Sequence, residues 1–453
     1  MYSMSNKSKD SNPSRNNSDQ RYPKQPTAEV DPVLNNVATL TDSERSGEKD
    51  KFNRLGWKRL TVCLIVEAIA LGALSIPKAF AIVGMFWGVI LTVGLGLLSI
   101  YTSYVVGQVK MRHEHVEHYA DAVRLIWGRF GYELTGAMFV MLLTLVVGSH
   151  TLTGKIAFAT ISDSRGVCAL LWSLLAAIIL FLCAVPPTFA DFAWLGYVDF
   201  ASIILAILIT IIATGYDAHH AVGGLAAVNW SWWPAPDVAF YEAFLAVTNI
   251  IFAYCFCVCQ YSFMAEMHTP KHYVKSIWAL GLIEIVIYTL TGALIYAFVG
   301  ADVESLALLS ASSTVARVAF GVALPVIFIS GSINTIVVGR YIMGRAFKDS
   351  DIRHVNTRKG WMVWLGLIAA ITTVAWLVAQ AIPLFNALLG LIASLFDSAF
   401  CYYYPALFWF RLVKEGKWYE GRKNIALSML NGLIFAIGLF TLCKLHMIVR
   451  CQS

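Results

Sequence analysis

The chain is built of long apolar blocks separated by short polar connections. From about residue 57 onward these blocks run for about twenty residues or more, long enough to cross a bilayer core of about 30 Å as helices. A soluble helical core would show polar stripes at helical spacing, which the blocks mostly lack. The pattern predicts eleven membrane spans, at residues 59–81, 85–109, 133–158, 167–187, 194–215, 240–265, 273–299, 314–341, 361–381, 384–410 and 425–447.

Two further stretches differ from these blocks. Residues 1–50 are rich in Ser, Asn, Asp, Lys and Pro, and they cannot bury enough apolar surface to offset the entropy of ordering. We therefore expect a disordered tail there. The stretch Glu117–Glu133 is polar and partly amphipathic, which predicts a helix lying against the membrane surface.

Composition supports an integral membrane protein. The chain has 453 residues, of which 58% are hydrophobic and 14% are charged, whereas a soluble domain has about a quarter charged residues. The net charge of +6 could suggest a nucleic-acid partner. The basic residues lie in short loops instead of on one continuous face, so we expect a lipid bilayer and no nucleic acid.

The basic residues also predict the orientation. Most of them flank the spans on the side of the N-terminus, and such a bias marks the cytosolic side. The opposite side has few: Lys155, Arg165, Arg317, Lys444 and Arg450. The N-terminus is therefore predicted to be cytosolic and the loop around Asn229 external. Asn229-Trp230-Ser231 matches a glycosylation acceptor there, although such short matches also arise by chance.

Two spans carry signs of interrupted helices. Span one contains Leu71–Pro77, in which Gly72 tolerates unusual backbone angles and Pro77 removes a donor. We expect an interruption there, with an ordinary packing kink as the alternative. Span six begins about 180 residues later, where a second inverted repeat of five helices would begin. Its centre, Asn249–Ser262, is polar and aromatic but has no Gly or Pro, so its break is less marked.

These segments carry a family resemblance. Glu67–Pro77 in span one, and span six followed by Glu266–Pro270 and Lys275-Ser276, resemble the amino acid/auxin permease family. The stretch from Ala190–Gly196 through Thr214-Gly215 is similar to the fungal branch of that family.

The resemblance covers residues 55–445 and implies an all-α membrane bundle of about eleven helices with a five-plus-five inverted repeat, as in leucine-transporter-like proteins. The implied transport domain spans residues 55–450. It consists of repeat one at 59–215, repeat two at 240–410 and an extra helix at 425–447.

The resemblance also implies an amino acid site between spans one and six. The backbone of span one would hold the carboxylate and amine of the substrate, and span six would line its side-chain pocket. The implied substrate-binding residues are Gly72, Ala73, Leu74, Ser75, Phe252, Tyr254, Cys255, Phe256 and Cys257. Fungal relatives usually have Gly-His where this chain has Phe256-Cys257. Because Phe fills space that Gly leaves open, substrate size or activity on common amino acids would change.

Buried charges are costly in a bilayer and therefore point to function. Glu67, Asp199, Glu284 and Asp397 lie within or near apolar spans. Asp199 could take up a coupling proton, whereas oxygen groups of span eight could bind sodium. Helix-packing hydroxyls are the alternative. The candidate coupling residues are Glu67, Asp199, Ser330, Ser332, Asn334 and Thr335.

Other chemistry is not indicated. The nine cysteines lie mostly in apolar blocks without the spacing of a disulfide framework or metal site. No motif indicates a cofactor, a metal or an enzyme. We therefore predict a secondary active transporter of amino acids or amino-acid-like solutes, neutral ones and coupled to a proton, with sodium as the alternative coupling ion. The alternative is a sensor of the same fold that binds without transporting. The predicted location is the plasma membrane, with the vacuolar membrane as the alternative.

Overall fold

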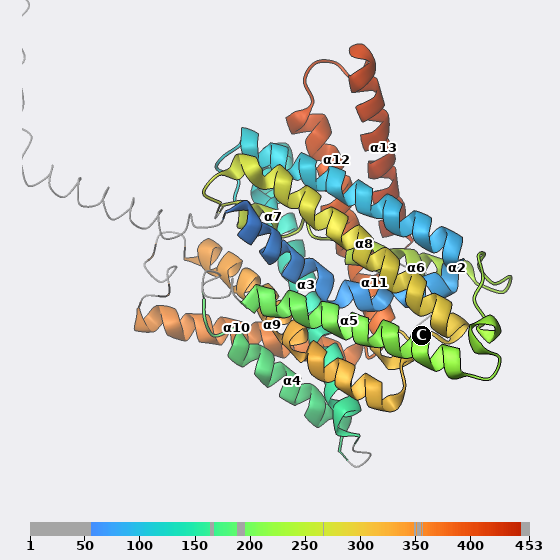
Figure 1. Ribbon diagram of the computed structural model, residues 1–453. Helices are drawn as coiled ribbons and strands as arrows, with labels where there is room; N and C mark the ends of the chain where they lie inside the picture. Colours follow the sequence, from blue (N-terminus) through green and yellow to red (C-terminus); the bar gives the residue numbers. More distant parts are fainter. Residues whose placement is uncertain are drawn as a thin grey trace, which may run out of the picture. The chain divides into compact units, whose positions relative to one another are not determined.

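The computed structural model describes residues 56–163, 167–187, 195–265, 267–347, 350, 355 and 357–444, without the side chains of Cys63, Glu67 and Ala70. The predicted tail of residues 1–50 and the side chain of Glu67 lie outside these described parts. The described residues form helices joined by short connections (Figure 1). The principal helices are α2 (Trp57–Arg112), α3 (Tyr119–Ser162), α4 (Ala169–Cys183), α5 (Leu195–His220), α6 (Phe240–Ala253), α7 (Gln260–Ala265), α8 (Tyr273–Val299), α9 (Ser313–Ala346), α10 (Arg358–Ala381), α11 (Phe385–Ile392), α12 (Tyr404–Phe408) and α13 (Gly421–Cys443).

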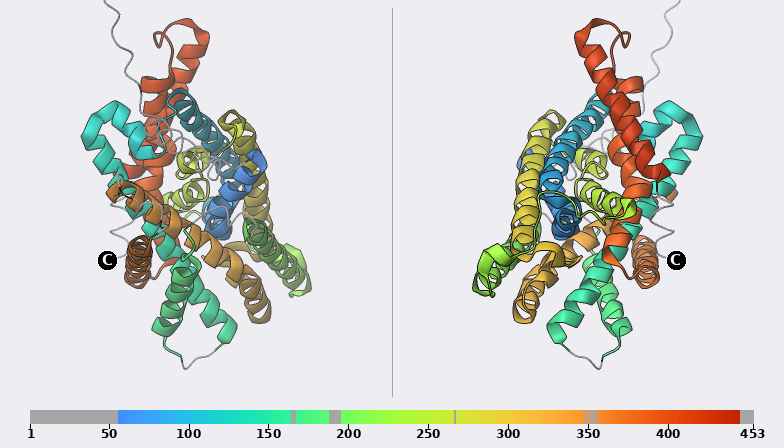
Figure 2. Two further views of the ribbon diagram at one scale, coloured as in Figure 1. Left: turned by 90° about the vertical axis from the view of Figure 1, so that its left-hand side faces the viewer. Right: turned by 90° about the vertical axis from the view of Figure 1, so that its right-hand side faces the viewer.

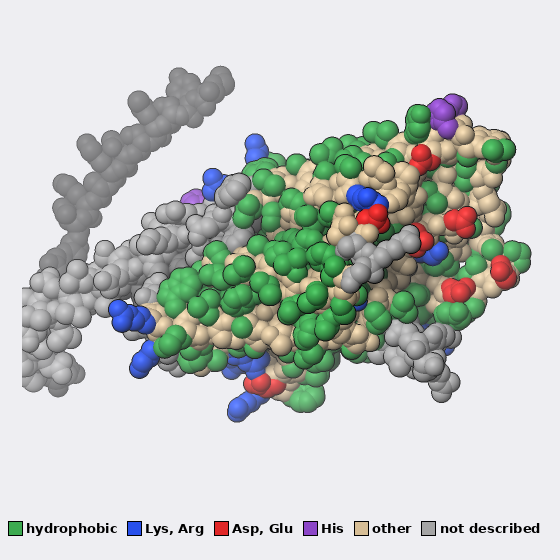
Figure 3. Space-filling view, turned by 90° about the horizontal axis from the view of Figure 1, so that it is seen from below, with side chains coloured by type: hydrophobic (Ala, Val, Ile, Leu, Met, Phe, Trp, Pro, Cys, Tyr) green, Lys and Arg blue, Asp and Glu red, His purple; other side chains and the backbone are tan. Residues whose placement is uncertain are grey.

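The helices have the length and surface of membrane spans. Within the described residues, eight are long and apolar enough to cross a bilayer, and α4 and α6 are shorter apolar helices. Large apolar side chains such as Phe130, Ile212 and Met429 are 69–74% exposed, as lipid contact requires. On the face in Figure 3, hydrophobic side chains cover much of the surface, most basic side chains lie toward the left, and most acidic ones lie toward the right. The all-α membrane fold is confirmed, whereas the count of eleven spans and the inverted repeat stay predictions.

The first two predicted spans are the two parts of α2. The backbone leaves helical geometry at Gly84, where φ is 81°, and the two parts run in opposite directions (Figure 1). The amides of Met85 and Phe86 each donate a hydrogen bond of 3.0 Å to a carbonyl oxygen in the loop that contains Trp232. A side chain at position 84 would collide with this loop, since its Cβ would lie 2.6 Å from the carbonyl carbon of Trp233. Glycine is therefore required both by the turn and by the packing.

The prediction that the helix of span one is interrupted is wrong, because the backbone of Leu71–Pro77 remains helical. A proline is tolerated inside a membrane helix where neighbouring groups compensate. The clear break lies in span six, where α6 ends at Ala253 and α7 begins at Gln260. The connection Tyr254–Cys259, called the span-six break below, is non-helical although it contains neither Gly nor Pro.

The helices that surround this break are held by extensive contacts. α2 packs mainly on α8, and α3 packs mainly on α9. The second pair is joined near both ends by ion pairs, Arg345 with Glu133 and Arg317 with Asp163. α4 lies beside the C-terminal part of α3 (Figure 2). Two π-helical stretches, η6 (Ala393–Tyr403) and η7 (Trp409–Val413), flank α12. η6 is deeply buried and reaches the span-six break.

Candidate functional site

A cavity lies where α2, α3, α9, η6 and the span-six break meet. Its volume is about 40 Å³ in this conformation, and it is partly open to solvent. Most of its wall is aliphatic or aromatic, with a few polar groups, which is the usual composition of a small-molecule site. The lining residues are Ala68, Leu71, Gly72, Leu142, Leu143, Val146, His150, Phe252, Cys255, Val258, Asn334 and Asp397.

Gly72 brings α2 against the end of α6 at one wall of this cavity. A Cβ at position 72 would lie 2.7 Å from the Cα of Ala253, closer than real Cβ contacts permit. Tyr288 of α8 joins the same two helices, since its hydroxyl lies 3.0 Å from the carbonyl oxygen of Ala68 and 3.1 Å from that of Ala253. The glycine therefore serves close helix packing, and the tyrosine satisfies carbonyls beside the broken helix.

Three polar side chains reach the cavity from different elements. His150 comes from α3, Asn334 from α9 and Asp397 from η6, and each is at most 2% exposed. Within the described residues, Nδ1 of His150 and Oδ1 of Asn334 have no hydrogen-bond partner. Since unsatisfied buried polar atoms are costly, their place beside a cavity fits a polar ligand or water. η6 places Asp397 on a π-helical stretch, a geometry found frequently at functional sites.

The structure brings part of the predicted substrate site together. Gly72, Phe252 and Cys255 line the cavity. The other predicted residues are adjacent in the chain but are not among the lining residues: Ala73, Leu74, Ser75, Tyr254, Phe256 and Cys257. The Phe256 side chain is 1% exposed and packs in the hydrophobic core. The substrate-binding role of all nine residues stays a prediction.

Two of the predicted coupling residues are in direct contact. The hydroxyl of Ser330 in α9 lies 3.1 Å from Oδ1 of Asp199 in α5 and donates over 2.7 Å to the carbonyl of Val66 in α2. Asn334 donates from Nδ2 to the carbonyl of Ser330 over 3.0 Å and also lines the cavity. A polar connection therefore runs from Asp199 to the cavity wall.

The remaining hydroxyls of span eight have local partners. Ser332 donates to the carbonyl of Ile329 over 2.8 Å, and Thr335 donates to that of Gly331 over 3.0 Å. Such bonds to the preceding helical turn fit the packing alternative.

Sequence reasoning missed two features of the site. His150 lies in span three, and a histidine inside an apolar span was the signal available for it. Asp397 stood out as a buried charge, but nothing local indicated that it reaches span six.

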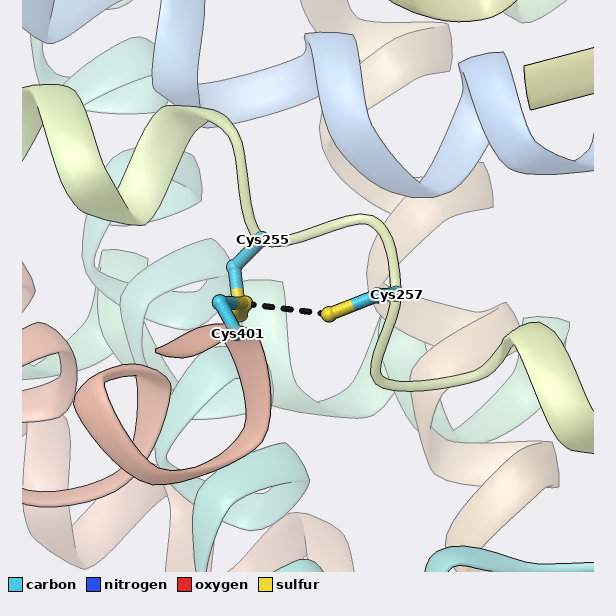
Figure 4. Close-up of side chains that lie close together, drawn as sticks. All are labelled: Cys255, Cys257 and Cys401. Carbon is cyan, nitrogen blue, oxygen red and sulfur yellow. Dashed lines mark hydrogen bonds between the residues drawn. A yellow bond between two sulfur atoms is a disulfide. The ribbon is translucent and has the colours of Figure 1, made fainter. Parts of the chain in front are cut away.

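A disulfide between Cys255 and Cys401 was also not expected from spacing, since the two residues are 146 positions apart. Their Cα atoms are 5.9 Å apart, within the usual range for a disulfide (Figure 4).

An all-helical membrane bundle with a partly polar cavity at a broken helix has the architecture of a membrane transporter. Comparison with protein families identifies the particular group. The chain belongs to the transmembrane amino acid transporter protein family, whose family model matches residues 53–449. The family predicted from spans one and six is thereby confirmed, and the protein is a multi-pass membrane protein.

Individual relatives agree with this assignment. The chain is 55% identical over 421 residues to the "N amino acid transport system protein" of Neurospora crassa, covering 92% of this chain and 89% of that protein. It is 30% identical over 391 residues to a "Transmembrane transporter" of Fusarium pseudograminearum, covering 86% and 82%.

The fold resembles that of Mhp1, a nucleobase-cation-symport-1 family transporter solved in a closed conformation with bromovinylhydantoin bound. The TM-score is 0.56, with 88% of this chain and 92% of that chain covered. At 14% identity this likeness concerns the fold alone.

Proposed function

We propose that this protein is a secondary transporter that carries neutral amino acids through the cavity between α2 and the span-six break. The observation that carries the proposal is the cavity itself, in which an apolar wall surrounds Asp397, Asn334 and His150. The Neurospora relative, named as an amino acid transport system protein, supports the substrate class.

The composition of the wall favours a neutral side chain. Asp397 offers a carboxylate for the substrate's amine, and Asn334 offers an amide for its carboxylate. The described lining residues include no Lys or Arg to balance an acidic side chain. Leu142, Val146 and Phe252 would contact an apolar side chain, since burial of apolar surface is favourable.

The break in span six supplies the polar main-chain groups. A regular helix pairs its own N–H and C=O groups, whereas a helix end leaves several of them for other partners. Because Leu71–Pro77 is helical, most main-chain groups of span one are already paired. We therefore place the main-chain contacts of the substrate chiefly at Tyr254–Cys259 in this conformation.

We further propose that a proton couples to transport through Asp199. Ser330 contacts this carboxylate, and Asn334 extends the connection to the cavity. A change of charge at Asp199 would therefore alter the electrostatic surroundings of Asn334, which faces the substrate. Sodium bound by the same oxygen atoms is the alternative, since carboxylate, carbonyl and hydroxyl oxygens also suit that ion.

Uptake into liposomes containing the purified protein tests these proposals. We expect labelled neutral amino acids to accumulate when the outside is made acidic, and an imposed sodium gradient at equal pH to have no effect. Accumulation that follows sodium alone would replace the proton by sodium. Saturable binding without accumulation under either gradient would overturn transport and favour the sensor.

A further inference from the structure

Three cysteines gather beside the cavity, one of them in its wall. Cys255 and Cys401 form a disulfide, and Sγ of Cys257 lies 3.2 Å from Sγ of Cys401 (Figure 4). All three sulfur atoms lie within 4.8 Å of one another. We infer that Cys255, Cys257 and Cys401 form a thiol–disulfide exchange site in which Cys401 pairs with either of the other two.

The position of this site connects it with the cavity. Cys255 and Cys257 both belong to the span-six break, and Cys401 belongs to η6, which also carries Asp397. Cys255 is part of the cavity wall and is partly exposed, whereas Cys257 and Cys401 are 2% and 1% exposed. The disulfide therefore joins the cavity wall at Cys255 to η6, at the point where helical hydrogen bonding is interrupted.

Exchange at this site needs no external oxidant. Cys257 loses its proton and its sulfur attacks Sγ of Cys401, which forms the Cys257–Cys401 bond and breaks the Cys255–Cys401 bond. The sulfur of Cys255 leaves with the electron pair and takes up a proton. One disulfide and one thiol are present before and after the step. The attachment to η6 moves by two residues along the break, and a thiol is released at the cavity wall.

Reduction is the second reaction that the geometry allows. Cys255 lines the cavity and is the partly exposed member of the disulfide, so a small dithiol would attack its sulfur first. Attack there gives a mixed disulfide with Cys255 and frees Cys401; the second thiol of the reagent then releases Cys255. The protein gains two thiols and the reagent becomes a cyclic disulfide. The span-six break and η6 are then no longer covalently joined.

Cys259 provides a matched control on the same segment. It is also fully buried in the span-six break, but it does not belong to the three-sulfur cluster. A buried cysteine of this kind usually behaves as a small hydrophobic residue.

The disulfide can be detected in the full-length protein. A protease site inserted between α9 and α10 separates a fragment with Cys255 and Cys257 from a fragment with Cys401. Thiols are blocked with N-ethylmaleimide in the membrane before cleavage, and the fragments are separated with and without dithiothreitol. We expect wild type and Cys259→Ser to stay joined until reduced, and Cys401→Ser to separate under both conditions.

The single variants test exchange. We expect Cys255→Ser to stay joined through Cys257 and Cys257→Ser to stay joined through Cys255, whereas the double variant separates. Separation of Cys255→Ser without reductant, at normal membrane abundance, would overturn the exchange. Separation of wild type without reductant would overturn the disulfide. If wild type separates in this way and retains a thiophilic metal ion that Cys401→Ser does not retain, the three sulfur atoms bind that metal instead.

The uptake rate gives an independent test of the exchange site, and this test rests on the proposed transport function. We expect dithiothreitol to change the uptake rate of wild type and of Cys259→Ser, and to leave Cys401→Ser unaffected. Equal rates before and after complete reduction of wild type would overturn a role for the site in transport. If the protein transports nothing under any gradient, the fragment experiment still decides the disulfide and only the proposed function fails.

Discussion

Asp397 presents a carboxylate to the cavity from a buried π-helical stretch. Replacement by Asn keeps the shape but removes the charge that would hold the substrate's amine. Hydrogen bonds to charged groups contribute about 1.5–3 kcal/mol, so we expect Asp397→Asn to lower the apparent affinity for amino acids by roughly 10–150-fold. Initial uptake rates over a range of substrate concentrations measure this change. The exposed Asp237→Asn is the control, and an unchanged affinity in Asp397→Asn would remove this residue from the site.

Phe252 and Phe256 lie in different surroundings although they are four residues apart. Phe252 lines the cavity, whereas Phe256 is buried in the core. We expect Phe252→Ala to shift preference toward bulkier substrates by roughly 10–200-fold, the usual effect of pocket changes of this size. We expect Phe256→Ala to lower protein abundance, because it leaves a void, without altering the ranking of substrates. Competition by a panel of amino acids against one labelled substrate measures the ranking for both variants. A changed ranking in Phe256→Ala would show that its ring contacts the substrate.

At the scale of helices, the close contact of α2 with the end of α6 determines where the cavity wall lies. A methyl group at position 72 would press on the Cα of Ala253, a backbone atom that cannot turn aside. Overpacking of this kind costs about 1–3 kcal/mol. We therefore expect Gly72→Ala to lower both the thermal midpoint of unfolding and the uptake per molecule. The exposed Gly94 of α2 has open space around it and makes Gly94→Ala the matched control. Equal midpoints for the two variants would contradict the close contact.

Spans one and six differ from the interruptions predicted for them. Gly72 and Pro77 were the visible signals in span one, yet α2 remains helical there, and Gly72 allows close packing against Ala253 instead. Span six has no such signal, yet it breaks after Ala253, whose carbonyl accepts from Tyr288. Partners on other helices therefore decide where a membrane helix is interrupted, and a single segment does not display them.

For the molecule as a whole, the charge pattern predicts a cytosolic N-terminus and an external loop at Asn229. Asn229 is exposed, and its carbonyl accepts from the amide of Ala301, so its side chain is accessible on an ordered loop. We expect an N-terminal tag to survive protease treatment of sealed right-side-out cells. We also expect a glycosidase to shift wild type on a gel and to leave Asn229→Gln unchanged. Cleavage of the tag in sealed cells would show that the N-terminus is external and would contradict the predicted orientation.

The sequence by itself determined the membrane class, the helical fold and the family, because hydropathy over about twenty residues and the order of short motifs are local properties of a chain. The family resemblance also pointed to Gly72, Phe252 and Cys255, which lie on two of the segments that line the cavity. Only the tertiary structure decided that His150, Asn334 and Asp397 reach this cavity, and that Cys255 meets Cys401. Those residues come from helices far apart in the chain, and in an almost uniformly apolar helix the hydrophobic pattern does not mark which face is turned inward. The packing of the helices on one another selects that face.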